Sequence, residues 1–182
     1  YVNTVRVGSV VNRQVSAIDT ERVLLDTQRV RDVVGYTLEH FDQKTMRASS
    51  FEHSVVANVP DVVKSRRRVE EAKIRRRVRG FNAIFATASI DAAKRYYTEF
   101  QRQMEPMVPD QRLKLALIYS YAPNEAVGDG LLSEEEFDTG GLTGSSRDFL
   151  EDAIQDYNAI FVTSYDTSSE GFQNYYKDVS MR

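Results

Sequence analysis

The clearest hydrophobic pattern lies mid-chain, where an apolar run is followed by a helix-forming segment. Residues 81–88 are apolar apart from Asn82 and Thr87, without the polar alternation of a strand that has one solvent face. This predicts a strand covered on both faces, followed by a helix from Ser89, as N-cap, to about Gln103. A second apolar run covers Leu113–Ala122. The order strand, helix, strand predicts a right-handed βαβ crossover and a parallel sheet.

Helical spacing predicts further elements on either side. Four apolar residues follow Asp26, a candidate N-cap, at helical spacing, which predicts an amphipathic helix over about 27–44. Residues 46–59 are predicted to be a loop with a short strand at 54–59, and residues 123–145 a long loop. Two C-terminal helices are predicted, one over about 147–161 capped by Ser145 or Ser146, and one opened by Ser168 or Ser169. We interpret their aromatic residues as core.

Residues 60–79 have the most uneven charge in the chain. Pro60 and Asp61 suit a first helical turn, so one basic helix is predicted as far as about Arg79. Two interpretations remain open: the helix binds phosphates through its charges, or it is a solvated helix stabilised by i,i+4 pairs such as Arg66–Glu70. On the first interpretation, the candidate DNA-binding residues are Arg75, Arg76 and Arg77.

Three segments partly match a nuclease motif, a calcium-binding loop and a phosphate-binding loop, but each lacks a feature that the site requires. Pro60-Asp61 with Glu71-Ala72-Lys73 matches a nuclease pattern, but one helix would hold the two acids about 15 Å apart, too far for one Mg²⁺. The loop 125–136 lacks a calcium ligand at its third position. The glycine-serine stretch 140–146 lacks the lysine of a phosphate loop. Neither histidine adjoins a nucleophile. We therefore predict no catalytic and no metal-binding residues.

Composition limits the class of protein without identifying it. A chain of 182 residues with a net charge of −3 fits one domain with an extension, and the chain as a whole is not an obvious nucleic-acid binder. The absence of cysteine is compatible with a cytoplasmic protein, and no apolar run approaches the ~20 residues of a membrane helix. Because the chain starts at Tyr1, we expect an excised fragment.

Four segments, in order, resemble one protein family. They are G-F-N-A-I-F-A-T-A-S-I-D-A-A-K-R-Y-Y (Gly80–Tyr97), L-K-L-A-L-I-Y-S-Y-A-P-N-E (Leu113–Glu125), E-E-F-D-T (Glu135–Thr139) and G-F-Q-N-Y-Y-K-D (Gly171–Asp178). They are similar to the R subunit, the motor and restriction subunit of type I restriction-modification enzymes. The resemblance covers residues 80–182, and 23–47 more weakly. The matching part is the second RecA-like helicase lobe, in which the segment around Ser89 resembles helicase motif IV.

The resemblance implies a fold and a function. It implies an α/β fold with a partial RecA-like parallel sheet and flanking helices over residues 80–182, preceded by a helical extension over 1–79. The parent protein would be a type I site-specific deoxyribonuclease that translocates duplex DNA with ATP and Mg²⁺, alongside methyltransferase and specificity subunits in the cytoplasm. The Walker motifs and the nuclease would lie elsewhere in that parent, so this fragment alone is expected to be inactive.

In such a lobe, phosphate contacts are expected at the carboxyl ends of strands and at helix N-termini. This selects Thr87, Ser89 and Ile90 after the first strand, with Lys94 or Arg95 one turn further on. Asp91 weakens this expectation, and Ser89 also fits a plain N-cap. The candidates after the second strand are Ser120 and Asn124.

A second function remains open, that of a non-enzymatic α/β module that binds nucleic acid or protein. Fold alone does not decide between the two, whereas Walker motifs in the upstream reading frame would favour the motor. We also expect the strand over residues 81–88 to have an open edge, which would allow a homodimer.

Overall fold

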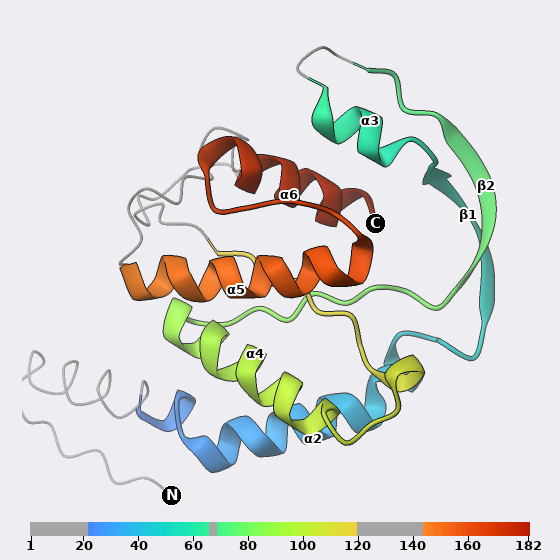
Figure 1. Cartoon of the computed structure of the whole chain (residues 1–182). Helices are drawn as coiled ribbons and strands as arrows, with labels where there is room; N and C mark the ends of the chain where they lie inside the picture. Colours follow the sequence, from blue (N-terminus) through green and yellow to red (C-terminus); the bar gives the residue numbers. More distant parts are fainter. Residues whose placement is uncertain (1–21, 66–68, 120–143) are drawn as a thin grey trace, which may run out of the picture. The chain divides into compact units, whose positions relative to one another are not determined.

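The computed structural model describes residues 22–65, 69–119 and 144–182 (Figure 1). It combines helices with a sheet, which confirms the predicted α/β class. The elements are α2 (Thr27–Lys44), β1 (Ser50–Val56), α3 (Val59–Lys64), β2 (Lys73–Arg79), α4 (Ile90–Met104), a 3₁₀ turn (Pro109–Gln111), α5 (Gly144–Phe161) and α6 (Ser169–Met181). In the part of the chain described, no helix is both long and apolar enough to cross a lipid bilayer.

Three predicted helices are confirmed together with their caps. A carboxylate oxygen of Asp26 accepts the N–H of Arg29 at 2.9 Å and caps α2. The Ser89 hydroxyl accepts the N–H of Ala92 at 3.1 Å at the start of α4. In the same way, Ser168 caps α6. Each cap satisfies one of the N–H groups that the first helical turn leaves without a partner.

Other predicted boundaries are wrong. Helix α5 begins at Gly144, so Ser145 and Ser146 lie within its first turn. The strand expected at 54–59 is β1, and it begins at Ser50. The basic helix expected over residues 60–79 is two elements, because α3 stops at Lys64 and the chain is extended again in β2.

The parallel sheet is also wrong for the described residues, where the sheet is the antiparallel pair β1–β2. Neither 81–88 nor the described part of 113–122 is a strand. A strand inside a parallel sheet needs both faces covered, but Ile84 is 98% exposed. In the second run, the hydroxyl of Tyr175 donates to the carbonyl of Leu117 at 3.0 Å, so a side chain satisfies a group that a neighbouring strand would otherwise satisfy.

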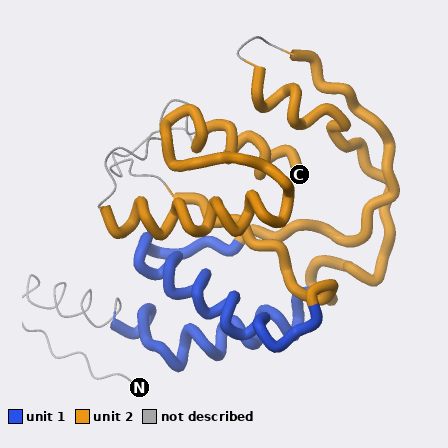
Figure 2. Tube along the Cα trace, viewed as in Figure 1, with its two compact units in different colours: residues 1–41, 85–108 blue, residues 42–84, 109–182 orange. Residues whose placement is uncertain are grey.

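The chain divides into two compact units, shown in Figure 2. Unit 1 comprises residues 1–41 and 85–108, and unit 2 comprises residues 42–84 and 109–182. Both units are therefore assembled from segments that are distant in sequence. The predicted domain boundary between residues 79 and 80 stays a prediction.

Unit 1 is a pair of helices, α2 and α4, that run in the same direction. The Arg95 guanidinium donates to the carbonyl of Leu25 at 2.6 Å, and the Gln103 amide donates to that of Arg31 at 2.9 Å. Between these contacts, the rings of Tyr96 and Phe100 are buried and each contacts the ring of Phe85. Val30 and Val34 on the apolar face of α2 are buried as well.

Glu99 is the charged residue in the buried face of α4, where it is 9% exposed. Its carboxylate accepts hydrogen bonds from Arg102 at 2.8 and 2.5 Å and from Gln103 at 2.7 Å. The hydrogen bonds from Arg102, above all, lower the pKa of Glu99 to about 2. The ionised form is therefore the one that the folded unit favours.

The contribution of the ionised Glu99 carboxylate to the stability of the fold should depend on pH. Because the folded pKa lies below the ordinary value of 4.5, its contribution is complete above about pH 4.5 and is lost as the pH falls toward 2. Glu99→Gln should therefore lower the melting temperature at about pH 6 more than at about pH 3. Thermal melts followed by circular dichroism measure this, and an equal decrease at both pH values would contradict it.

Unit 2 has an aromatic core between α5 and α6. The side chains of Tyr157, Phe172 and Tyr175 are at most 2% exposed, and the rings of the two tyrosines meet edge to face with centroids 5.0 Å apart. This confirms the interpretation of these aromatic residues as core. Burial raises the pKa of Tyr119 and of Tyr165 to about 12, so these hydroxyls stay neutral at physiological pH.

Asp178 lies inside this core at 1% exposure. It accepts a hydrogen bond from the hydroxyl of Tyr157 at 2.9 Å, and Nε of Arg182 lies 3.0 Å from each carboxylate oxygen. The Arg182 guanidinium also lies 4.5 Å from the ring centroid of Phe161. The Arg182 guanidinium and the Tyr157 hydroxyl thus compensate the buried negative charge.

Candidate nucleic-acid interface

Strands β1 and β2 form a two-stranded antiparallel ribbon, called the ribbon below. Its register pairs Ser50 with Arg79 at one end and Val56 with Lys73 at the other. Because successive side chains of a strand point to opposite faces, every second residue of β2 falls on the same face. This basic face contains Lys73, Arg75, Arg77 and Arg79, opposite Ser50, Glu52, Ser54 and Val56.

The opposite face of the ribbon, called the apolar face below, is partly buried. It contains Ile74, Arg76 and Val78 of β2 opposite Phe51, His53 and Val55 of β1. Phe51, Val55 and Val78 are half-buried. The Phe51 ring contacts that of Phe81 with centroids 4.6 Å apart. This face is therefore partly covered, at Phe51, Val55 and Val78, whereas His53, Ile74 and Arg76 are exposed.

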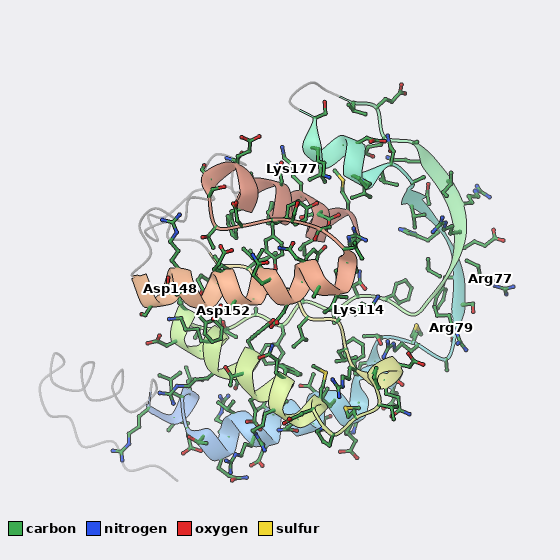
Figure 3. All side chains as sticks on the ribbon, viewed as in Figure 1. Arg77, Arg79, Lys114, Asp148, Asp152 and Lys177 are labelled. Atoms are coloured by element: carbon green, nitrogen blue, oxygen red, sulfur yellow. The ribbon has the colours of Figure 1, made fainter. Side chains whose placement is uncertain are left out.

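On the basic face, all four cationic side chains are exposed. Figure 3 labels Arg77 and Arg79 at the ribbon, where Arg77 projects away from the strands. Lys73 forms an ion pair with Glu71 at 3.1 Å, in which both side chains are largely exposed. Between described residues, Arg75, Arg77 and Arg79 form no ion pair, so their guanidinium groups are available to an anion.

A glycine joins the end of β2 to the end of α2. Gly80 has φ +66° and its N–H donates to the carbonyl of Ser49 at 3.2 Å, while the N–H of Phe81 donates to that of Thr45 at 2.8 Å. Helix α2 ends just before this point, with Met46 in the left-handed region and the N–H of Arg47 bonded to the carbonyl of Asp42. This is the Schellman pattern, and it fixes the position from which the ribbon starts.

The ribbon changes the sequence-based candidate set. Arg75 and Arg77 share the basic face, whereas Arg76 lies on the other one. Lys73 and Arg79 join the first pair, although neither was a candidate. The signal was present in the alternation K-I-R-R-R-V-R, which places a cation at every odd position and an apolar residue at two of the three even ones.

The remaining described candidates lie in unit 1, at the start of α4. Ser89 is exposed and caps the helix, Ile90 is the first helical residue, and the hydroxyl of Thr87 donates to the carbonyl of Ser89 at 3.2 Å. The three residues therefore lie together at a helix N-terminus, which has a partial positive charge. Asp91 in the first turn opposes an incoming anion.

Of the two cations one turn further on, Arg95 has a structural partner, since it bonds the carbonyl of Leu25 at 2.6 Å. Lys94 is half-buried on the same helix. Ser120 and Asn124 lie outside the described residues.

Comparison with known proteins gives one family and a set of relatives. The family described as "Type I restriction enzyme subunit R domain 3" matches residues 79–182. The "Type I restriction enzyme SauCOLORF180P endonuclease subunit" of Staphylococcus aureus (strain COL) is 29% identical in an alignment 184 residues long that covers 98% of this chain. The "Type I restriction enzyme SsaAORF53P endonuclease subunit" of Staphylococcus saprophyticus is 28% identical in an alignment 166 residues long that covers 90% of this chain.

The alignments cover 15% of the first relative and 13% of the second, so the chain corresponds to a small part of these proteins. The family match covers more than half of the chain. The chain therefore belongs to the family of type I restriction enzyme subunit R domain 3.

Proposed function

We propose that this chain is part of the ATP-dependent DNA translocase of a type I restriction endonuclease R subunit, where it contacts the phosphate backbone of duplex DNA. The observation that carries the proposal is the family match over residues 79–182. The names of the curated relatives, all endonuclease subunits of type I restriction enzymes, agree with it. The second RecA-like lobe is the part of the motor to which the chain is assigned.

The geometry supports phosphate contact in two places, one in each compact unit. In unit 1, the N-terminus of α4 offers backbone N–H groups beside the exposed Ser89, and such groups bind anions. In unit 2, Arg75 and Arg77 project from the exposed face of the ribbon. Guanidinium groups bind phosphate with paired hydrogen bonds. Arg95 contributes less to DNA binding in this proposal, because it already bonds a carbonyl group.

ATP and Mg²⁺ belong to the parent protein in this proposal. Among the described residues, no group of three histidine or carboxylate side chains lies close enough together to hold a metal ion. No reaction step is assigned to a side chain of this chain. Its role is to position DNA, and a nuclease and an ATP site elsewhere in the parent would supply the chemistry.

The proposed partners follow from the same assignment. They are double-stranded DNA and, in the parent complex, the methyltransferase and specificity subunits in the cytoplasm. Homodimerisation through the segment 81–88 stays a prediction. The second candidate function, a non-enzymatic nucleic-acid or protein interaction module, is favoured by one observation, the ribbon with its exposed basic face, because that surface needs no motor to bind an anion.

Measurements of ATP binding and hydrolysis distinguish the DNA translocase from the non-enzymatic interaction module. The isolated 182-residue chain is expected to show no ATP hydrolysis and no saturable binding of Mg-ATP by calorimetry, because the stretch 140–146 lacks the phosphate-loop lysine. The full-length protein that contains this chain should hydrolyse ATP when duplex DNA is added and should displace a triplex-forming strand from it. Micromolar ATP binding by the isolated chain would contradict the assignment of ATP to other parts. A full-length protein without DNA-dependent ATP hydrolysis would favour the interaction module.

A further inference from the structure

The ribbon divides its charged residues between two faces. Lys73, Arg75, Arg77 and Arg79 alternate with Ile74, Arg76 and Val78, and the register with β1 places the two sets on opposite faces. Ring contact between Phe51 and Phe81 anchors the apolar face. The side-chain positions on the basic face are therefore set by the strand geometry and not by flexible loops.

The basic face has the chemistry of a phosphate-binding surface. Successive cations on one face of a strand are about 6.6–6.8 Å apart, a separation comparable with that of neighbouring phosphates along one DNA strand. Three of the four cations are arginines, whose planar guanidinium groups bind phosphate oxygens in pairs. The carboxylate on this face is Glu52, opposite Arg77.

The type of nucleic acid follows from what the face lacks. Surfaces that bind single strands stack bases on aromatic side chains, whereas the eight residues of the basic face include no aromatic one. A row of cations without stacking partners contacts the backbone and reads no base sequence. These properties favour a duplex, whose two strands present a dense row of phosphates.

We infer that the basic face of the ribbon, Lys73, Arg75, Arg77 and Arg79, binds the phosphates of one strand of double-stranded DNA independently of sequence, and that Arg76 takes no part. The choice of DNA as the polyanion rests on the proposed function. The inference goes further by identifying the contact surface and its register. It also assigns Glu52 a role, since a carboxylate within the row weakens phosphate binding at Arg77 and limits the affinity.

The test is a scan of single substitutions in the full 182-residue chain. Binding of a fluorescein-labelled 20-base-pair duplex, a length of about two helical turns, is measured by anisotropy over a series of salt concentrations. Arg75→Gln and Arg77→Gln should each weaken binding about 3- to 10-fold and lower the salt slope by about 0.9. Arg76→Gln, which removes the same charge from the same strand, should change affinity less than about 2-fold.

Glu52→Gln provides a variant of opposite sign. Removing the carboxylate should strengthen duplex binding about 2- to 3-fold, because the repulsion between it and the phosphates disappears. Far-UV circular dichroism of each variant checks that the ribbon is retained. Along β2, duplex affinity should therefore fall for the Arg75 variant, stay nearly unchanged for the Arg76 variant and fall for the Arg77 variant. On β1, the Glu52 variant should bind the duplex more tightly.

Several results would overturn the inference. They are an equal loss for Arg76→Gln and its two neighbours, tighter binding of a single strand than of the duplex, and no measurable duplex binding by the wild-type chain. The motor assignment is tested separately by the ATP hydrolysis of the full-length protein. If duplex affinity falls at Arg75 and Arg77 but not at Arg76, and the full-length protein does not hydrolyse ATP, the DNA-binding surface stands and the motor assignment is wrong. If the full-length protein hydrolyses ATP but the three variants lose affinity equally, the motor assignment stands and the surface is wrong.

Discussion

Replacing Asp178 by alanine is expected to destabilise the protein by about 2–4 kcal/mol, because it removes a buried hydrogen-bond acceptor and leaves a space in the core. Asp178 is 1% exposed and accepts hydrogen bonds from Tyr157 and Arg182. Without the carboxylate, the hydroxyl of Tyr157, itself in a residue only 2% exposed, loses its acceptor. The Arg182 guanidinium would lose its ion pair and would keep its contact with the ring of Phe161.

Thermal melts and urea unfolding followed by circular dichroism measure this loss. A chain of this size should lose about 2–4 °C in melting temperature for each kcal/mol. Asp152→Ala is the matched control, since Asp152 is exposed on the neighbouring helix α5 (Figure 3), and it should change stability by less than about 0.5 kcal/mol. Asp178→Asn keeps the shape and one acceptor, so it should lie between the two. Equal stability of the Asp178 and Asp152 alanine variants would show that the network contributes nothing.

This network also shows where inference from the sequence stops. Asp178 and Arg182 are four residues apart, the second at the C-cap of α6, so their ion pair is a local contact. The contact with Tyr157 joins residues 21 positions apart on two helices, and no local pattern encodes that separation. The aromatic residues of α5 and α6 could be assigned to a core, but the carboxylate among them could not.

The helices were predictable because the features that specify them are local. The caps Asp26, Ser89 and Ser168 each act on an N–H three residues away, and the apolar spacing of α2 lies within one helix. Such patterns depend on a few neighbouring residues. The same local cap placed Ser89 and Ile90 at the start of α4, whereas their contact with DNA stays a prediction.

The ribbon was missed because two periodicities coincide in β2. Ile74 and Val78 are four residues apart, which fits one face of a helix with period 3.6 and one face of a strand with period 2. Pro60 and Asp61 correctly indicated a helix start, and no glycine or proline interrupts residues 62–79. Pairing with β1 is a non-local contact, and it decides the conformation of residues 73–79.

The apolar run 81–88 shows the converse problem. Its composition suits a buried strand, but composition does not supply the neighbours that a strand needs. In the described part of the chain no strand pairs with it, and Phe81 and Ile84 remain largely exposed. Sequence alone therefore identified an apolar segment and misjudged its partners.

Replacing Gly80 by alanine is expected to destabilise the protein by about 2–4 kcal/mol through backbone strain and a clash. Gly80 has φ +66°, a conformation that costs an L-residue with a side chain about 1–2 kcal/mol. A Cβ atom at this position would lie 2.8 Å from the carbonyl oxygen of Thr45 and 3.0 Å from Cα of Arg47. Both are backbone atoms at the end of α2, so a change of side-chain rotamer cannot relieve the contact.

Gly144→Ala is the control, because Gly144 begins α5 and a Cβ there would meet no atom of the other described residues within 4 Å. It should leave the melting temperature unchanged or raise it slightly, since alanine favours a helix over glycine by up to about 1 kcal/mol. Gly80→Ala should instead melt earlier, and its duplex affinity should fall at temperatures where the chain is still folded, because Gly80 fixes the end of β2 from which the basic face extends. Equal melting temperatures for the two variants would show that the backbone around Thr45 can shift to accommodate the Cβ atom without loss of stability. A destabilised Gly80 variant with unchanged duplex affinity would separate the stability of this junction from the DNA contact.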